Sequence, residues 1–248
     1  MSSDSKKEWF GEWFDSPYYH ILYKNRDYSE AETFINNVIH KLEMASGDKV
    51  LDIACGKGRH SIFLNKNGMN VTGIDLSVQS IEFAKQFEND KLHFANHDMR
   101  ETFQESQFDF VVNLFTSFGY FSDEKDNQKA INSAIDNLKP NGKMLLDFLN
   151  PTKVINQLKK DEKKTIDGIS FDIHKRVDEN NFIVKTIEFN DNEIDFKFEE
   201  KVKALKQTDF ITYFNNAGAK IIGTYGSYEF DKFDMDNSDR MIFIAEKK

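Results

Sequence analysis

The most informative stretch of this sequence is KVLDIACGKG, residues 49–58. Its apolar first half follows the turn-forming residues 46–48, which predicts a short buried strand over 49–54. Gly56 and Gly58 then predict a tight turn, and helical spacing continues through Leu64. The stretch is therefore read as one strand, loop and helix unit.

The same alternation continues along the chain in both directions. Apolar runs predict strands at 70–74, 92–95, 108–114 and 143–149, and helical periodicity predicts helices at 28–45, after Ser77 and at 126–138. Strands that are apolar throughout are typical of a parallel sheet covered by helices on both faces.

The period changes after Pro151. Alternating apolar residues over 169–205, with turn residues at 178–181 and 190–193, predict an antiparallel meander of three strands. The charged run 159–164 is interpreted as a solvated helix end. A helix at 208–216 and strands at 219–225 and 241–246 follow.

Together these elements predict a Rossmann-like, doubly wound α/β fold with a mostly parallel seven-stranded sheet and a β-meander inserted after the fifth strand. The segments expected are an N-terminal lid and helix at 1–47, a nucleotide-binding-type domain at 48–150 and 207–248, and the inserted sheet at 151–206.

Composition narrows the function classes. The chain has 248 residues and a net charge of −9, which disfavours a nucleic-acid partner, and 39% hydrophobic residues exclude global disorder. The only cysteine, Cys55, fits a reducing compartment. No signal-type start and no apolar segment of about 20 residues is present, so we expect a cytoplasmic protein without a membrane partner.

The candidate site follows from the fold, because ligands of open parallel sheets bind beyond the carboxyl ends of the strands. Small residues at 54, 56 and 58 allow close approach to the backbone, and Asp75 is suited to bind both hydroxyls of a ribose. Asp52 would repel a pyrophosphate and attract an ammonium group. Ser61 stands where a dinucleotide fingerprint has its third glycine, so that match is incomplete.

Five segments in this order complete a pattern. They are DIACGKG at 52–58, GIDLS at 73–77, HDMR at 97–100, FDFVVNL at 108–114 and LKPNGK at 138–143. In this combination the sequence resembles the class I S-adenosylmethionine-dependent methyltransferases, in particular bacterial small-molecule enzymes with an inserted antiparallel sheet.

The resemblance implies S-adenosylmethionine as cofactor and no metal. It implies that Asp52 orients the glycine loop beside the methionine ammonium group and that the ribose lies at Asp75 and Leu76. It also places adenine at Asp98 and Met99 and the methionine chain at Asn113 and Leu114. The cofactor residues expected are Tyr18, Tyr23, Arg26, Asp52, Ala54, Gly56, Gly58, Asp75, Leu76, Asp98, Met99, Asn113 and Leu114. Ala54 replaces a glycine common in the family.

The class of methyl acceptor is indicated mainly by motifs that the sequence lacks. Residues 113–121 lack the Asn/Asp-Pro-Pro-Tyr/Phe motif and the Pro-Cys nucleophile of base-methylating enzymes, which favours methylation of N or O in a small molecule. No catalytic residue is assigned; positioning candidates are Tyr18, Thr116, Tyr120 and Arg240. Arg240 fits an acceptor anchor or a structural ion pair.

Several alternatives stay open. Tyr18, Tyr23 and Arg26 fit a lid over the cofactor or a packing strip against the first long helix. The inserted sheet fits a roof on the acceptor side, as in family members with small acceptors, or a dimer surface. An NAD(P)-dependent oxidoreductase and a noncatalytic S-adenosylmethionine-binding regulator are the rival functions. The oligomeric state is left undetermined, and Cys55, Arg59 and His60 receive no catalytic role.

Overall fold

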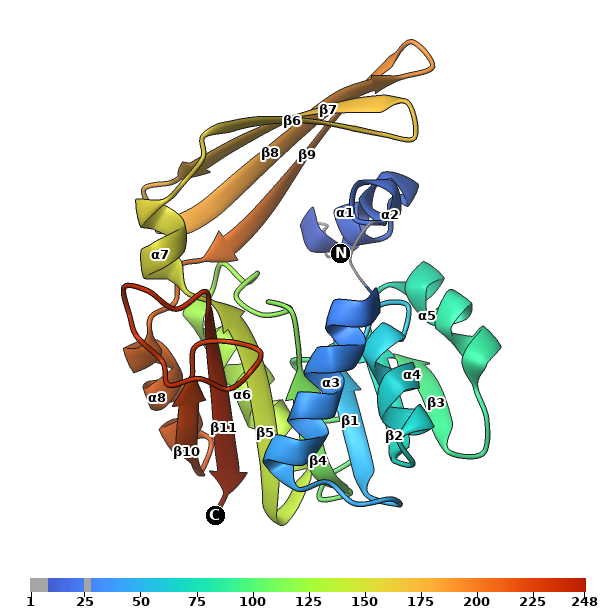
Figure 1. The fold of residues 1–248 in the computed structure, drawn as a ribbon, viewed down its shortest axis with the longest axis vertical. Helices are drawn as coiled ribbons and strands as arrows, with labels where there is room; N and C mark the ends of the chain where they lie inside the picture. The colour runs from blue at the N-terminus through green and yellow to red at the C-terminus, as the bar shows by residue number, and fades with distance from the viewer. Residues whose placement is uncertain (1–8, 25–27) are drawn as a thin grey trace, which may run out of the picture. The chain divides into compact units, whose positions relative to one another are not determined.

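The computed structural model describes residues 9–24 and 28–248 (Figure 1). Its described residues fall into two compact units: 9–24 with Gln157–Ala204, and 28–156 with Leu205–Lys248. The segment 1–47 expected from the sequence thus contributes to both units. Arg26 lies outside the described residues.

The larger unit is built on a seven-stranded sheet, as predicted. Its strands are β1 (Lys49–Ile53), β2 (Asn70–Asp75), β3 (Leu92–Asn96), β4 (Phe108–Asn113), β5 (Leu138–Leu149), β10 (Ala219–Tyr225) and β11 (Arg240–Lys247). They lie in the order β10-β11-β5-β4-β1-β2-β3, and only β11 runs antiparallel to its neighbours. The strand order reverses between β1 and β4, where such sheets bind their ligands.

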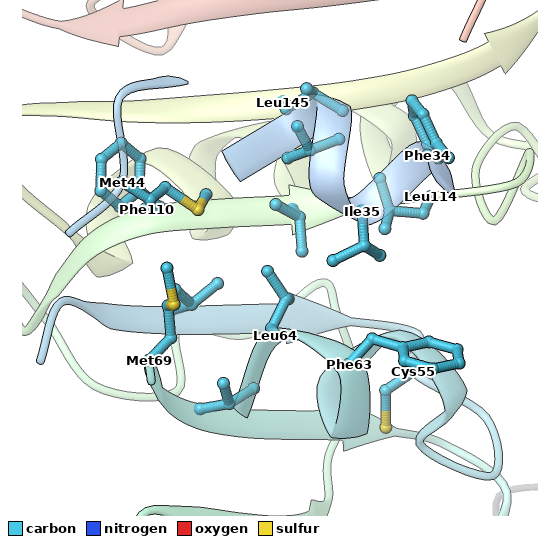
Figure 2. Close-up of a cluster of buried hydrophobic side chains, with 14 of the residues drawn as sticks. Phe34, Ile35, Met44, Cys55, Phe63, Leu64, Met69, Phe110, Leu114 and Leu145 are labelled. Carbon is cyan, nitrogen blue, oxygen red and sulfur yellow. The ribbon is translucent and has the colours of Figure 1, made fainter. Parts of the chain in front are cut away.

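Helices cover both faces of this sheet. They are α3 (Tyr28–Leu42), α4 (Arg59–Lys66), α5 (Val78–Ala84), α6 (Glu124–Asn137) and α8 (Gln207–Asn216), with a 3₁₀ turn at Lys85–Phe87. The short helix α7 (Pro151–Asn156) follows β5. Helices α3, α4 and α5 share one buried cluster with the sheet, which includes Phe34, Ile35 and Leu64 from the helices and Phe110 and Leu145 from the strands (Figure 2). Helical spacing of the apolar residues explains this packing.

The opposite face carries α6 and α8. Phe210 of α8 is fully buried, with its ring centroid 5.2 Å from that of Phe148 on β5 and 4.8 Å from that of Phe243 on β11. The predicted doubly wound α/β fold is therefore confirmed, with an apolar layer on each side of the sheet.

The smaller unit contains a four-stranded antiparallel sheet in the order β6-β7-β8-β9. Its strands are β6 (Asp161–Ile166), β7 (Ile169–Val177), β8 (Phe182–Asp191) and β9 (Ile194–Lys203). The predicted meander is present, but the interpretation of 159–164 as a helix end was wrong, because Asp161–Ile166 pairs with β7. Charged residues on a solvated edge strand discourage further pairing and hide the period-two pattern of the strand.

Two short helices, α1 (Trp9–Phe14) and α2 (Pro17–Leu22), pack on this sheet. Trp13 and Leu22 are buried in one cluster with Phe171 and Phe189. Each helix is thus held within the smaller unit by an apolar contact. Among the described residues, no helix is long and apolar enough to span a membrane.

Candidate functional site

The loop after β1 lies at the point where the strand order reverses. Ala54, Gly56 and Gly58 all have positive φ, at 58°, 55° and 79°. Gly58 begins α4, and a Cβ there would lie 2.6 Å from the Phe94 ring, whereas a Cβ on Gly56 would meet nothing within 4 Å. The first glycine therefore leaves the backbone open to a ligand, and the second allows close packing.

Asp75, the last residue of β2, connects this loop to the next one. Its Oδ2 accepts the Gly56 N–H at 2.8 Å, and its Oδ1 accepts the Ser77 N–H at 2.8 Å. The two bonds orient the carboxylate between the β1 and β2 loops. A carboxylate held in this way is suited to accept hydrogen bonds from vicinal hydroxyl groups.

Asp52 lies beneath the loop on β1, with 1% of its surface exposed. Burial raises the pKa of Asp52 to about 7, with a further contribution from the charge of Asp75, while the hydrogen bond from Ser61 opposes the rise. Two acidic groups at one loop favour a cationic ligand group, because a nearby positive charge offsets both their burial and their mutual repulsion.

Asp98 follows β3, and Arg100 holds it in place. Arg100 Nε and Nη2 donate to the two carboxylate oxygens at 3.0 Å and 2.6 Å. Although partial burial opposes ionisation, the hydrogen bonds and charge of Arg100 outweigh it and lower the pKa of Asp98. Met99 is half-buried beside it, and Leu76, after β2, is 43% exposed.

Asn113 ends β4 and joins it to β1. Its Nδ2 donates to the Ile53 carbonyl at 3.0 Å, and its buried Oδ1 has no hydrogen-bond partner among the described residues. The next side chain, Leu114, belongs to the apolar core. The two residues expected to contact the methionine chain thus lie at the carboxyl end of β4, next to β1.

Three of the four positioning candidates meet around one turn. Arg240 Nη2 donates to Thr116 Oγ1 at 2.8 Å, and the Tyr120 hydroxyl donates to the Thr116 carbonyl at 2.6 Å. Arg240 also binds Asp147, a fully buried residue of β5 that the sequence interpretation did not select. The signal available was a single charge inside the apolar run 144–149.

The remaining candidates lie in the smaller unit. The Tyr18 hydroxyl donates to Asp191 at 2.9 Å, and the Tyr23 hydroxyl donates to Glu200 at 2.7 Å. Both tyrosines therefore have partners in the antiparallel sheet, and their roles at the cofactor stay predictions.

Cys55 and His60 lie near the loop after β1, and neither was predicted to be catalytic. Burial, followed by the charges of Asp52 and Asp75, raises the pKa of the Cys55 thiol well above its ordinary value, which opposes thiolate chemistry. His60 is buried, with its ring stacked 4.8 Å from that of Phe115. In the part of the chain that the structure describes, no group of acidic, His and Cys side chains is arranged to hold a metal ion.

Comparison with known proteins supports the resemblance seen in the sequence. Residues 50–142 match the model of a family described as "Methyltransferase domain". A putative methyltransferase of Bacillus subtilis, YqeM, is 38% identical over 43% of this chain and 44% of its own length. This chain thus aligns with less than half of that relative.

Two longer similarities extend beyond the domain. The glycine/sarcosine N-methyltransferase of Aphanothece halophytica is 26% identical over 92% of this chain and 85% of its own length. The crystal structure of an S-adenosylmethionine-dependent methyltransferase from Clostridium acetobutylicum superposes with a TM-score of 0.77 at 21% identity, covering 93% of this chain and 96% of that one. The latter similarity concerns the fold.

Proposed function

We propose that this protein transfers a methyl group from S-adenosylmethionine to a nitrogen or oxygen atom of a small-molecule acceptor. The observation that carries the proposal is the junction of Asp75 with the loop after β1, where the carboxylate accepts the Gly56 N–H above a second, buried acid, Asp52. A ribose and an ammonium group are the ligand groups that this junction fits.

The residues present fit the cofactor. Asp75 would hold the ribose hydroxyls, Asp98 and Met99 would lie at the adenine, and the loop at 54–58 would approach the methionine part with its backbone. When bound, the sulfonium would supply an activated methyl group to the acceptor lone pair, with the sulfur–carbon bond breaking and its electron pair staying on sulfur.

The chain's contribution to such an in-line displacement is positioning and exclusion of water. The acceptor atom must also lose a proton when it is a protonated amine or a hydroxyl group. No described residue is assigned as the base, because the proton can leave to solvent before attack. The rate then depends on how well acceptor and methyl donor are aligned.

A small amine is the acceptor class that we favour. The relative similar over nearly the full chain is named a glycine/sarcosine N-methyltransferase, and the chain is acidic and lacks base-methylation motifs. A nucleic-acid acceptor would require a positive surface that the net charge of −9 does not favour.

The rival oxidoreductase is disfavoured by one hydrogen bond. Ser61, at the position of the third fingerprint glycine, donates to Asp52 at 2.6 Å, so this position serves the acid instead of close helix packing. Titration with NADH tests this rival by fluorescence: absence of binding supports our proposal. Formation of S-adenosylhomocysteine in the presence of a small-molecule extract excludes a noncatalytic regulator.

The direct test is isothermal titration with S-adenosylhomocysteine. We expect binding by the wild type and a loss of at least about tenfold in affinity for Asp75→Ala, because the ribose hydroxyls lose their acceptor. The matched control is Asp109→Ala. Asp109 lies at the amino end of β4, away from the loop after β1, and binds Lys139. Unchanged affinity in Asp75→Ala, or no binding by the wild type, contradicts the proposal.

A further inference from the structure

The turn after β4 contains two consecutive residues in a strained conformation. Phe115 and Thr116 have φ values of 56° and 62°, in the left-handed region that favours glycine. A bulky aromatic residue and a β-branched residue both avoid this region. Such a pair persists only where surrounding contacts fix it, and strain of this kind is concentrated at functional sites.

Asp147 supplies the principal contacts. Its Oδ2 accepts the Phe115 N–H at 2.8 Å, and its backbone carbonyl accepts the Thr116 N–H at 3.0 Å. Its Oδ1 accepts Arg240 Nε at 2.8 Å, and Arg240 Nη2 reaches Thr116 Oγ1 at 2.8 Å. One fully buried carboxylate and one guanidinium therefore fix both strained residues.

The Phe115 ring is also held in place by neighbouring aromatic rings. The ring of His60 is stacked against it at 4.8 Å, with an interplanar angle of 14°, and the Tyr228 ring centroid lies 5.3 Å away. The guanidinium of Arg240 lies 5.6 Å from the centre of the Tyr228 ring. Backbone and side chain of the turn are thus fixed together.

The position of the turn indicates what it serves. The proposed cofactor residues Gly56, Asp75 and Asp98 lie at the carboxyl ends of β1, β2 and β3, on one side of the point where strand order reverses. Asp147 and Arg240 belong to β5 and β11, on the other side. The turn starts directly after Asn113 and Leu114, the residues proposed to contact the methionine chain. A group bound beside this turn would therefore lie next to the methyl donor, where the acceptor must bind.

We propose that Asp147 is a positioning residue which, together with Arg240, fixes the Phe115–Thr116 turn as the support for the methyl acceptor. This inference rests on the proposed function. It assigns Arg240 to an ion pair that acts on the acceptor through the turn, and it predicts that the pair affects transfer without affecting cofactor affinity.

The test compares Asp147→Asn with Asp109→Asn. Asp109 is a matched control, because one of its oxygens accepts the Lys49 N–H at 2.9 Å and the other binds Lys139 Nζ at 2.6 Å, at the amino end of β4. The first measurement is the amide proton shift of Phe115 in protein labelled with ¹⁵N-phenylalanine. Phe115→Leu identifies the resonance.

We expect this resonance to move upfield in Asp147→Asn, because a neutral amide is a weaker acceptor than a carboxylate, and to stay unchanged in Asp109→Asn. Affinity for S-adenosylhomocysteine should stay within about threefold of wild type by titration calorimetry. Methyl transfer to a small-molecule cell extract should fall by at least about tenfold.

An unmoved Phe115 resonance, an unchanged transfer rate, or a cofactor affinity that falls as much as the transfer rate would each overturn the inference. If Asp147→Asn does not fold, Arg240→Gln carries the transfer and affinity measurements, since it removes the guanidinium contacts to both Asp147 and Thr116. Failure of the proposed function is separate: the wild type would then not bind S-adenosylhomocysteine or would transfer no methyl group.

Discussion

The Ser61 hydroxyl donates to Asp52 Oδ2 across 2.6 Å in the interior of the larger unit. This bond connects the first turn of α4 to the central strand β1, directly below the glycine loop. It is the single side-chain hydrogen bond that opposes protonation of Asp52. The pKa of Asp52 thus reflects a balance in which burial and the charge of Asp75 raise it, while hydrogen bonds from Ser61 and the charge of Arg59 lower it.

Cofactor affinity should therefore depend on pH. The pKa of Asp52 is raised to about 7 in the free protein, and an ammonium group bound nearby favours the ionised form. Binding then releases a proton below pH 7, so affinity for S-adenosylhomocysteine should rise by up to about tenfold per pH unit toward 7 and level off above it. Calorimetry at pH 6 and pH 8 measures this change.

The control for this prediction is Asp52→Asn, in which affinity should be nearly the same at both pH values. Running each titration in two buffers of different ionisation enthalpy counts the protons released. Equal wild-type affinity at pH 6 and pH 8, with no proton release at pH 6, would contradict a role for Asp52 in cofactor binding.

Ala54→Gly should be neutral or stabilising. Ala54 has φ of 58°, which costs an alanine about 1–2 kcal/mol relative to glycine. Glycine also gives the unfolded chain more freedom, which costs about 0.4–1 kcal/mol. The free energy of unfolding in urea should therefore change by roughly 0 to +1.6 kcal/mol. A clear loss of stability would show that the alanine methyl group makes a packing contact of its own.

Gly73→Ala should have the opposite effect in the neighbouring strand. A Cβ on Gly73 would lie 2.7 Å from Phe94 Cδ1 and 2.8 Å from Cys55 Sγ. Overpacking of this kind costs about 1–3 kcal/mol of unfolding free energy in a urea titration. Phe94→Leu in the same chain should restore part of the loss, and a wild-type stability for Gly73→Ala alone would refute the proposed clash.

Glu200→Gln should loosen α1 and α2 from the antiparallel sheet of the smaller unit. Glu200 accepts the Trp13 indole N–H at 2.7 Å and the Tyr23 hydroxyl, and it forms an ion pair with Lys185 Nζ at 3.3 Å. Hydrogen bonds to charged groups contribute about 1.5–3 kcal/mol each, so local opening should become easier by a similar amount. Hydrogen exchange of the 9–24 segment measures this opening.

The neighbouring Glu199 provides the control. Glu199 pairs with Lys201 at 3.0 Å and is more exposed than Glu200, so Glu199→Gln should leave the exchange of 9–24 unchanged. Equal effects of the two substitutions would show that overall charge, and not the buried network, holds the two helices.

The β1 to β2 region was predictable because its signals are local. Each signal acts within a few residues of its own position: the apolar strands, the glycines at 56 and 58, and the acid at 75. A tight turn also allows few backbone conformations, several of which favour glycine. The predicted turn accordingly follows β1, and Asp75 is the last residue of β2, as the sequence indicated.

Other features depend on contacts that no local pattern reveals. Asp147 and Arg240 are 93 residues apart and meet because β11 pairs antiparallel with β5, with Arg240 opposite Leu149. Strand β6 escaped detection because edge strands carry charge where interior strands carry apolar residues. The partners of Tyr18 and Tyr23 likewise depend on which sheet the N-terminal helices pack against.

The two tryptophans of the chain, Trp9 and Trp13, both lie in α1, and the Trp13 ring is buried 4.6 Å from Phe198 of β9. Indole emission is therefore an optical signal from the smaller unit alone, while the proposed cofactor residues after β1, β2, β3 and β4 belong to the larger one. A spectral change on adding S-adenosylhomocysteine would report that the smaller unit responds to the cofactor, without any label attached to the protein.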